Sequence, residues 1–150
     1  MLKRTILSNA EYLLDINVLV ALVDDSHSHH NLATEWFDSI KGKQWGVCTL
    51  TEAGFLRVMT RPATGCLSVE QASDVLERLA ARPGYRFWPL SEDWSSTAGP
   101  FKGRVFGHQQ ITDALLLGLA VKEGGILVTF DKAIGHIAGR RFAGNLLVLQ

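Results

Sequence analysis

The spacing of apolar residues along the chain follows two different periods, which predict two kinds of element. Short apolar runs predict buried strands, at 12–14, 45–48, 86–90, 126–129 and 146–149. Apolar residues three or four positions apart predict amphipathic helices, at 18–23, 30–41, 49–61, 68–81 and 110–122, and a short helix is expected at 132–137. Residues 91–108 are rich in glycine and predict loops.

The alternation of strands with helices predicts an α/β protein with a largely parallel sheet that helices cover on both faces. Its 150 residues contain no internal repeat and no low-complexity segment, so we expect a single domain. In sheets of this kind, ligands bind at the carboxyl ends of the strands.

Composition excludes several classes of protein. Lys and Arg together number 15, as do Asp and Glu, so the chain has no net charge, and any attraction to a nucleic acid must come from local patches. The two cysteines, Cys48 and Cys66, do not have the spacing of a zinc site or a disulfide framework. Because no apolar run is long enough for a signal peptide or a membrane span, we expect a cytoplasmic protein without membrane association.

Four acidic residues occupy positions at which a structural role competes with a chemical one. Asp15 ends the first predicted strand, and Asp131 follows the strand at 126–129. For each of them, a role as N-cap of the next helix is as plausible as a functional role. Glu52 fits a capping box. Asp113 lies in the most apolar helix of the chain, where a charge with a purely surface role is unusual, so a function is favoured there.

Taken together, the four acids favour chemistry. Asp15 and Asp131 lie at the carboxyl ends of strands, Glu52 follows the second strand, and Asp113 is near the start of the helix that leads back to the sheet. We therefore expect the four carboxylates to converge on one edge. Like charges at such distances require a cation, and donors that are all oxygen select Mg²⁺ or Mn²⁺. A site of this kind activates water and stabilises charge on a phosphodiester.

The segments around these acids resemble the PIN domain and, within it, the VapC-type toxins of bacterial toxin–antitoxin pairs. They are LLDINVLVAL, TLTEAGFLRV, GHQQITDALLLGLA and LVTFD, in the order of the family. The resemblance implies a three-layer α/β/α sandwich and an Mg²⁺-dependent endoribonuclease. The implied catalytic and metal-binding set is Asp15, Glu52, Asp113 and Asp131.

The resemblance also implies supporting residues and partners. Asn17 and Thr129 match polar positions of the family, and toxins of this kind are held inactive by a cognate antitoxin and often form homodimers. Residues 1–10 precede the matching segments and are expected to be a loosely ordered N-terminal extension. Residues 62–106 carry no family motif and so indicate little about the substrate.

A few polar residues near Asp113 are candidates for binding the RNA substrate, for which tRNA is one possibility. Lys102 and Arg104 lie in a glycine-rich loop, and His108 follows it, so we expect these side chains to contact phosphates. Gln109 lies about one helical turn before Asp113 and is expected to orient it.

Two alternatives without catalysis remain at this point: a receiver-like signalling module, or a PIN-like protein that only binds a partner. A receiver has a second acid after its first strand and a phosphoacceptor Asp after a middle strand. Here Asn17 takes the place of the second acid, and no Asp follows the strand at 45–48. The four intact acids argue against a protein that only binds a partner.

Overall fold

The computed structural model describes residues 11–64 and 66–150, so the expected N-terminal extension at 1–10 lies outside the described residues. Four short strands form one parallel sheet in the order β2-β1-β3-β4. They are β1 (Tyr12–Leu14), β2 (Trp45–Gly46), β3 (Ile126–Thr129) and β4 (Leu146–Val148).

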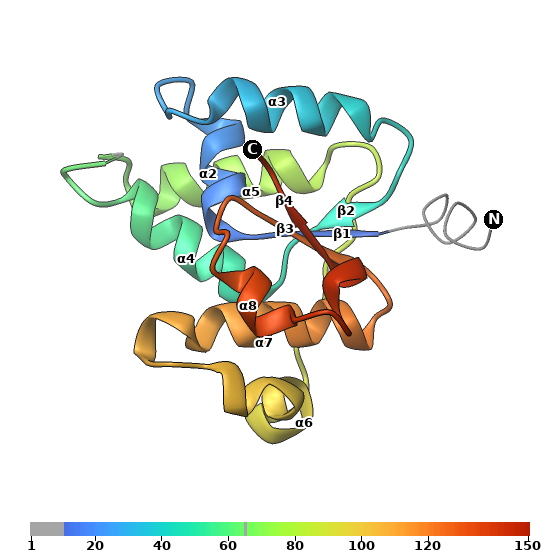
Figure 1. Cartoon of the computed structure of the whole chain (residues 1–150). Helices are drawn as coiled ribbons and strands as arrows, with labels where there is room; N and C mark the ends of the chain where they lie inside the picture. The colour runs from blue at the N-terminus through green and yellow to red at the C-terminus, as the bar shows by residue number, and fades with distance from the viewer. Residues whose placement is uncertain (1–10, 65) are drawn as a thin grey trace.

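Helices cover both faces of this sheet, which confirms the predicted three-layer α/β/α sandwich (Figure 1). One layer holds α2 (Ile16–Val23), α3 (His30–Ser39), α4 (Thr49–Met59) and α5 (Val69–Ala80). The other holds α6 (Trp94–Ala98), α7 (Ile111–Lys122) and α8 (Ile134–Ala138), with short 3-10 turns η1 (Gly99–Arg104), η2 (His108–Gln110) and η3 (Ala143–Asn145). No helix in the described part of the chain is long and apolar enough to cross a membrane.

The apolar strands are explained by two cores, one on each face of the sheet. Leu13 and Leu127 point into the core that contains α7, while Leu14 and Val128 point into the core beneath α2, α3 and α4. Successive side chains of a strand face opposite sides, so a strand covered on both faces must be apolar throughout. Helix α7 is buried along most of its length, as its continuous apolar sequence predicts.

The segment at 86–90, expected to be a strand, is extended backbone without a strand ladder. It runs beside β2, where the Arg86 and Trp88 amides donate to the carbonyls of Trp45 and Val47 at 2.8 and 2.9 Å. Only Tyr85 forms a β-bridge there, and Pro89 has no N–H with which to continue the pairing.

The stretch expected to be loop, 91–108, contains helix α6 and η1. Asp93 begins α6 as an N-cap, with its side chain accepting from the Ser96 amide at 2.8 Å. An Asp at the N-cap is a sequence signal for the start of a helix. The glycines of this segment favoured the prediction of a loop instead.

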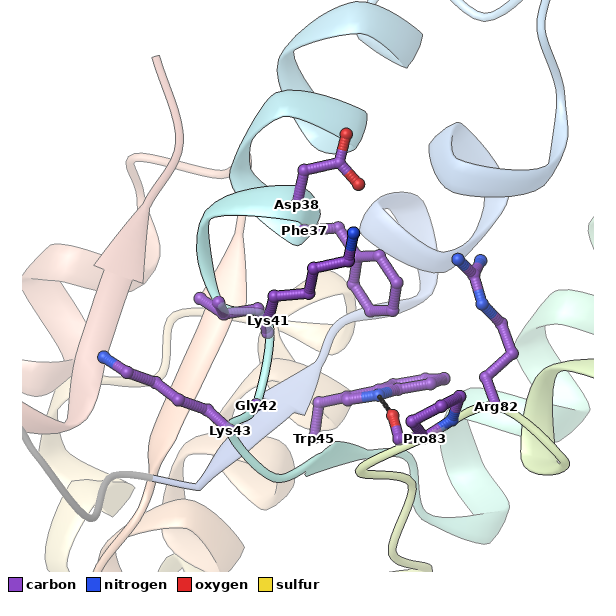
Figure 2. A pocket seen from close by; sticks show the side chains of 9 residues that line it. Phe37, Asp38, Lys41, Gly42, Lys43, Trp45, Arg82 and Pro83 are labelled. Carbon is purple, nitrogen blue, oxygen red and sulfur yellow. Dashed lines mark hydrogen bonds between the residues drawn. The ribbon is translucent and has the colours of Figure 1, made fainter.

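The two ends of the sheet have different surroundings. At the amino end of β2, Trp45 donates from Nε1 to the Pro83 carbonyl at 3.0 Å, and Arg82 lies 4.8 Å from the centre of the Phe37 ring. Figure 2 shows these side chains closing that end around a small hollow of about 100 Å³. At the other end, the chain leaves β1 toward β2 and returns to β3 on the opposite side, so a switch point lies between β1 and β3.

Candidate active site

A cleft of about 380 Å³ opens at the carboxyl ends of β1 and β3, where ligands of parallel sheets bind. Three of the four predicted carboxylates line it: Asp15 directly after β1, Asp131 two residues after β3, and Asp113 on the first turn of α7. Three elements far apart in the sequence thus bring their acids to one place.

Asp15 is fixed at both carboxylate oxygens. Its backbone amide donates to the Val128 carbonyl at 3.0 Å, which continues the pairing of β1 with β3 up to the acid itself. One oxygen accepts from the Ile16 amide at 2.7 Å, and the other accepts from the Thr129 hydroxyl at 2.7 Å. Asp15 therefore occupies the N-cap position of α2 and lines the cleft as well, although only 6% of its surface is exposed.

Thr129 connects two of the acids. Its hydroxyl donates to Asp15 and accepts from the backbone amide of Asp131 at 3.0 Å. Asp131 in turn accepts from the Ala133 amide at 2.8 Å, which holds its carboxylate in a tight turn. The buried hydroxyl of Thr129 thus sets the spacing between the ends of β1 and β3.

Burial and the closeness of other carboxylates disfavour negative charge on the aspartates of the cleft. Burial raises the pKa of Asp113 to about 7, and the neighbouring Asp15 and Asp131 carboxylates add to the increase. Burial also raises the pKa of Asp15, although its hydrogen bonds to Thr129 and Ile16 oppose that effect. Within residues 11–64 and 66–150, the ion pairs are Arg86 with Glu11 and Lys122 with Glu92, so none of them satisfies these aspartates.

Glu52 does not join the three aspartates. It lines a separate groove between α4 and α5, together with Ser73, Leu76 and Glu77. There its pKa is raised by burial, and its charge contributes to the raised pKa of Tyr85.

The rotation of α4 explains where Glu52 points. Helix α4 presents Gly54, Arg57, Val58 and Arg61 to the cleft. Glu52 lies two residues before Gly54, which is roughly 200° around a helix of 3.6 residues per turn. The expected capping box is also absent, because the N-cap is Cys48 and makes no side-chain capping bond.

Gly54 is a cleft residue that the sequence interpretation missed. A Cβ at this position would lie 2.2 Å from Cδ1 of Ile16, so a larger residue would require the Ile16 side chain to move. A lone glycine inside a predicted helix is the signal that indicates such a contact. Thr112, which also lines the cleft, carried no distinguishing signal.

The remaining predicted residues divide between the cleft and other surfaces. Asn17 and Gln109 line the cleft, and His108 lines a neighbouring hollow. Lys102 is exposed on η1, outside the lining of the cleft. The Arg104 guanidinium packs against Gly139 at the end of α8, where a Cβ would lie 1.8 Å from it, so the structure does not bring Lys102 and Arg104 to the carboxylates.

The raised pKa of Asp113 predicts how the stability of the metal-free protein depends on pH. A carboxyl group whose pKa is higher in the folded chain contributes stability below its ordinary value near 3.8, and this contribution is lost as the pH rises through about 7. We expect the free energy of unfolding, measured by urea denaturation in EDTA, to fall between pH 4 and pH 8. The fall should be smaller in Asp113→Asn, and an equal slope in both proteins would contradict this assignment.

The fold and cleft define an α/β protein with an acidic site at the switch point of a parallel sheet. The chain belongs to the PIN domain family, whose model matches residues 12–140. It is 43% identical over 131 residues to ribonuclease VapC38 of Mycobacterium tuberculosis, covering 86% of this chain and 91% of that protein. It is 37% identical over 127 residues to ribonuclease VapC44 of the same species, covering 84% and 89%.

Solved structures agree on the fold. VapBC2 from Rickettsia felis, bound to a DNA fragment from its promoter, gives a TM-score of 0.64 at 17% identity, covering 93% of this chain and 99% of the compared chain. VapC20 of Mycobacterium tuberculosis, described as a toxin that cleaves the sarcin-ricin loop, gives 0.61 at 14% identity, covering 83% and 92%. At these identities the likeness shows the architecture alone.

Proposed function

We propose that this protein is a metal-dependent endoribonuclease and the toxin of a toxin–antitoxin pair. The observation that carries the proposal is the meeting of Asp15, Asp113 and Asp131 in one cleft at the switch point of the sheet. The relatives VapC38 and VapC44, which align with most of this chain, are named ribonucleases, and this supports RNA as the substrate.

A hard divalent cation fits the residues that line the cleft. All three acids offer oxygen ligands, and both effects that raise the pKa of Asp113, burial first and repulsion by Asp15 and Asp131 second, are relieved by a nearby positive charge. The described side chains do not form a compact group of metal ligands by themselves. Mg²⁺ suits such an open set because it retains several water ligands, so we infer Mg²⁺, with Mn²⁺ as a substitute.

The three aspartates, as we propose, hold the cation, and Glu52 lies outside this set because it faces the groove between α4 and α5. When bound, the cation supplies a water of lowered pKa and stabilises charge on the phosphodiester. Thr129 keeps Asp15 and Asp131 at a fixed spacing, and Ile16 holds the second oxygen of Asp15. Asn17 and Gln109 add amide groups that can orient a water or a phosphate oxygen in the same cleft.

Helix α4 contributes two basic residues to the lining of the cleft. They are Arg57 and Arg61, and both are exposed. Guanidinium groups bind phosphate through paired N–H donors, so these arginines are placed to hold the RNA backbone in the same cleft as the aspartates. Because the whole chain has no net charge, attraction of a polyanion requires local groups of positive charge such as this pair.

Replacing both arginines by alanine is expected to raise the KM for RNA about tenfold, with a smaller effect on kcat. The salt dependence of binding should weaken as well, with a slope lower by about 1.4, because two phosphate contacts to a single strand are lost. Steady-state cleavage at several salt concentrations measures both effects. Arg82→Ala, at the opposite end of the sheet beside Phe37, is the matched control and should leave KM unchanged. An unchanged KM and slope in the double variant would remove the arginines from the RNA-binding surface.

We further propose a cognate antitoxin as the partner of this chain and a homodimer as its assembly. The VapBC2 complex supports the first. The second follows from the family resemblance, and tRNA remains the first substrate to try. Sedimentation of the purified chain at several concentrations tests the dimer, for which we expect twice the mass of 16.5 kDa. A constant monomer mass would contradict it.

The proposed activity is tested with a pool of small RNAs, tRNA included, incubated with the purified chain in Mg²⁺, in Mn²⁺ and in EDTA. We expect internal cuts in the presence of either metal and none in EDTA. The protein must first be freed of any bound partner by denaturation and refolding. Intact RNA under every metal condition would favour a module that binds a partner without catalysis.

A further inference from the structure

Phe106 is the most exposed of the large apolar side chains in the described chain, with 83% of its surface accessible. It lies in the short connection between η1 and η2, just before helix α7, which carries Asp113. Single exposed apolar residues are common and by themselves need no explanation. The position of this ring beside the cleft is what gives it significance.

The loop that carries Phe106 has a defined shape. The Phe106 amide donates to Oε1 of Gln110 at 2.8 Å, which ties the loop to the start of α7. Gly107 follows with φ +134°, a conformation that side chains of other residues rarely adopt. The ring is therefore presented to solvent by a constrained backbone next to the catalytic helix.

A hollow of about 170 Å³ lies beside this ring and shares one lining residue, Gln109, with the cleft. Phe106 and His108 line it on either side of Gly107, so two planar rings border one small space. A chain whose phosphate lies at the aspartates can therefore place a neighbouring group over Phe106.

We propose that Phe106 is a stacking platform for a nucleobase beside the scissile phosphate, so that the cleft selects unpaired RNA. This inference rests on the proposed ribonuclease function. Every base has a π face, so stacking on an aromatic side chain strengthens single-strand binding whatever the base. Bases in a duplex are already stacked on one another, so only unpaired nucleotides can occupy the platform.

Three variants of Phe106 test the platform. Leucine keeps the apolar surface without the π face, alanine removes both, and tryptophan retains an aromatic ring. We expect alanine and leucine to raise the KM for a single-stranded RNA about tenfold while kcat changes less than twofold, and tryptophan to keep the wild-type KM. If Phe106→Leu has the same KM as the wild type, the proposal is overturned, because an apolar contact without a π face would then be enough for RNA binding.

A binding measurement separates this inference from the proposed activity. In an Asp113→Asn background, an RNA oligonucleotide with one 2-aminopurine is expected to lose fluorescence on binding, and Phe106→Leu should abolish that quenching. If the wild-type chain cleaves RNA but the Phe106 variants bind and cleave as it does, the platform is refuted and the ribonuclease stands. If the wild-type chain neither cleaves nor binds RNA, the proposed function fails first and the platform with it.

The alternative to a nucleobase on Phe106 is a second copy of this chain, with the ring buried in a dimer interface. Light scattering on the wild type and Phe106→Ala distinguishes the two, and the stacking proposal predicts the same mass for both. A dimer that becomes a monomer on loss of the ring would assign Phe106 to a protein interface and overturn the proposal.

Discussion

Asp113→Asn is expected to lower RNA cleavage by about a thousandfold or more, equivalent to about 4 kcal/mol of transition-state stabilisation. The asparagine keeps the size of the side chain but removes one of the three charges that line the cleft. Burial raises the pKa of Asp113 to about 7, and the neighbouring carboxylates of Asp15 and Asp131 add to the increase. Single-turnover cleavage in saturating Mg²⁺ measures the loss in the chemical step.

The folded state of this variant is the control. Removing a carboxylate that is costly to ionise should leave the metal-free protein at least as stable as the wild type at neutral pH. An unchanged near-ultraviolet circular dichroism spectrum would show that α7 has kept its packing. Cleavage within tenfold of the wild-type rate would contradict a catalytic role for Asp113.

Thr129→Val is expected to reduce cleavage about ten- to a hundredfold and to lower the free energy of unfolding by about 1–3 kcal/mol. Valine matches threonine in shape but cannot donate to Asp15 or accept from the Asp131 amide. The buried carboxylate of Asp15 then loses its only side-chain donor in the described structure, and the spacing of the two acids is no longer fixed. Cleavage rates and urea denaturation measure the two effects.

Thr129→Ser is the matched variant, because serine keeps the hydroxyl. We expect it to retain most of the cleavage activity and to lose only the packing of one methyl group. If valine and serine reduce cleavage equally, the effect arises from packing at the end of β3, and the hydrogen bonds have no part in it.

The positions of the three aspartates follow from rules that a sequence exposes. Asp15 and Asp131 come after apolar strands, and parallel strands bring their carboxyl ends to one edge whatever the details of packing. Asp113 was identified by its charge within an apolar helix. The order of strands, which places the switch point between β1 and β3, is a tertiary property that no local pattern contains.

Glu52 shows where sequence reasoning ends. Its place in the sequence, soon after the second strand, is right for the cleft, but the direction of its side chain depends on the rotation of α4. In the rotation observed, Gly54 lies against Ile16, Arg57 and Arg61 line the cleft, and Glu52 lines the groove between α4 and α5. A difference of two residues along a helix moves a side chain to nearly the opposite face.

The basic residues Lys102 and Arg104 lie away from the lining of the cleft for a similar reason. Lys102 and Arg104 are close to Asp113 in the sequence, but the 3-10 turn η1 packs against α8, and the Arg104 guanidinium lies over Gly139. Arg57 and Arg61, more distant in the sequence, line the cleft instead. Long flexible side chains carry little information about direction until the backbone beneath them is known.

We propose that the three aspartates, without Glu52, hold the cation with which the protein cleaves RNA. The most direct test is the Mg²⁺ dependence of cleavage after EDTA treatment, compared among the wild type, Asp131→Asn and Glu52→Gln. We predict no cleavage in EDTA, recovery of the wild type and Glu52→Gln at the same Mg²⁺ concentration, and recovery of Asp131→Asn only at a much higher one. Equal cleavage by the wild type with and without Mg²⁺, or a Glu52→Gln variant that needs far more Mg²⁺, would contradict the account.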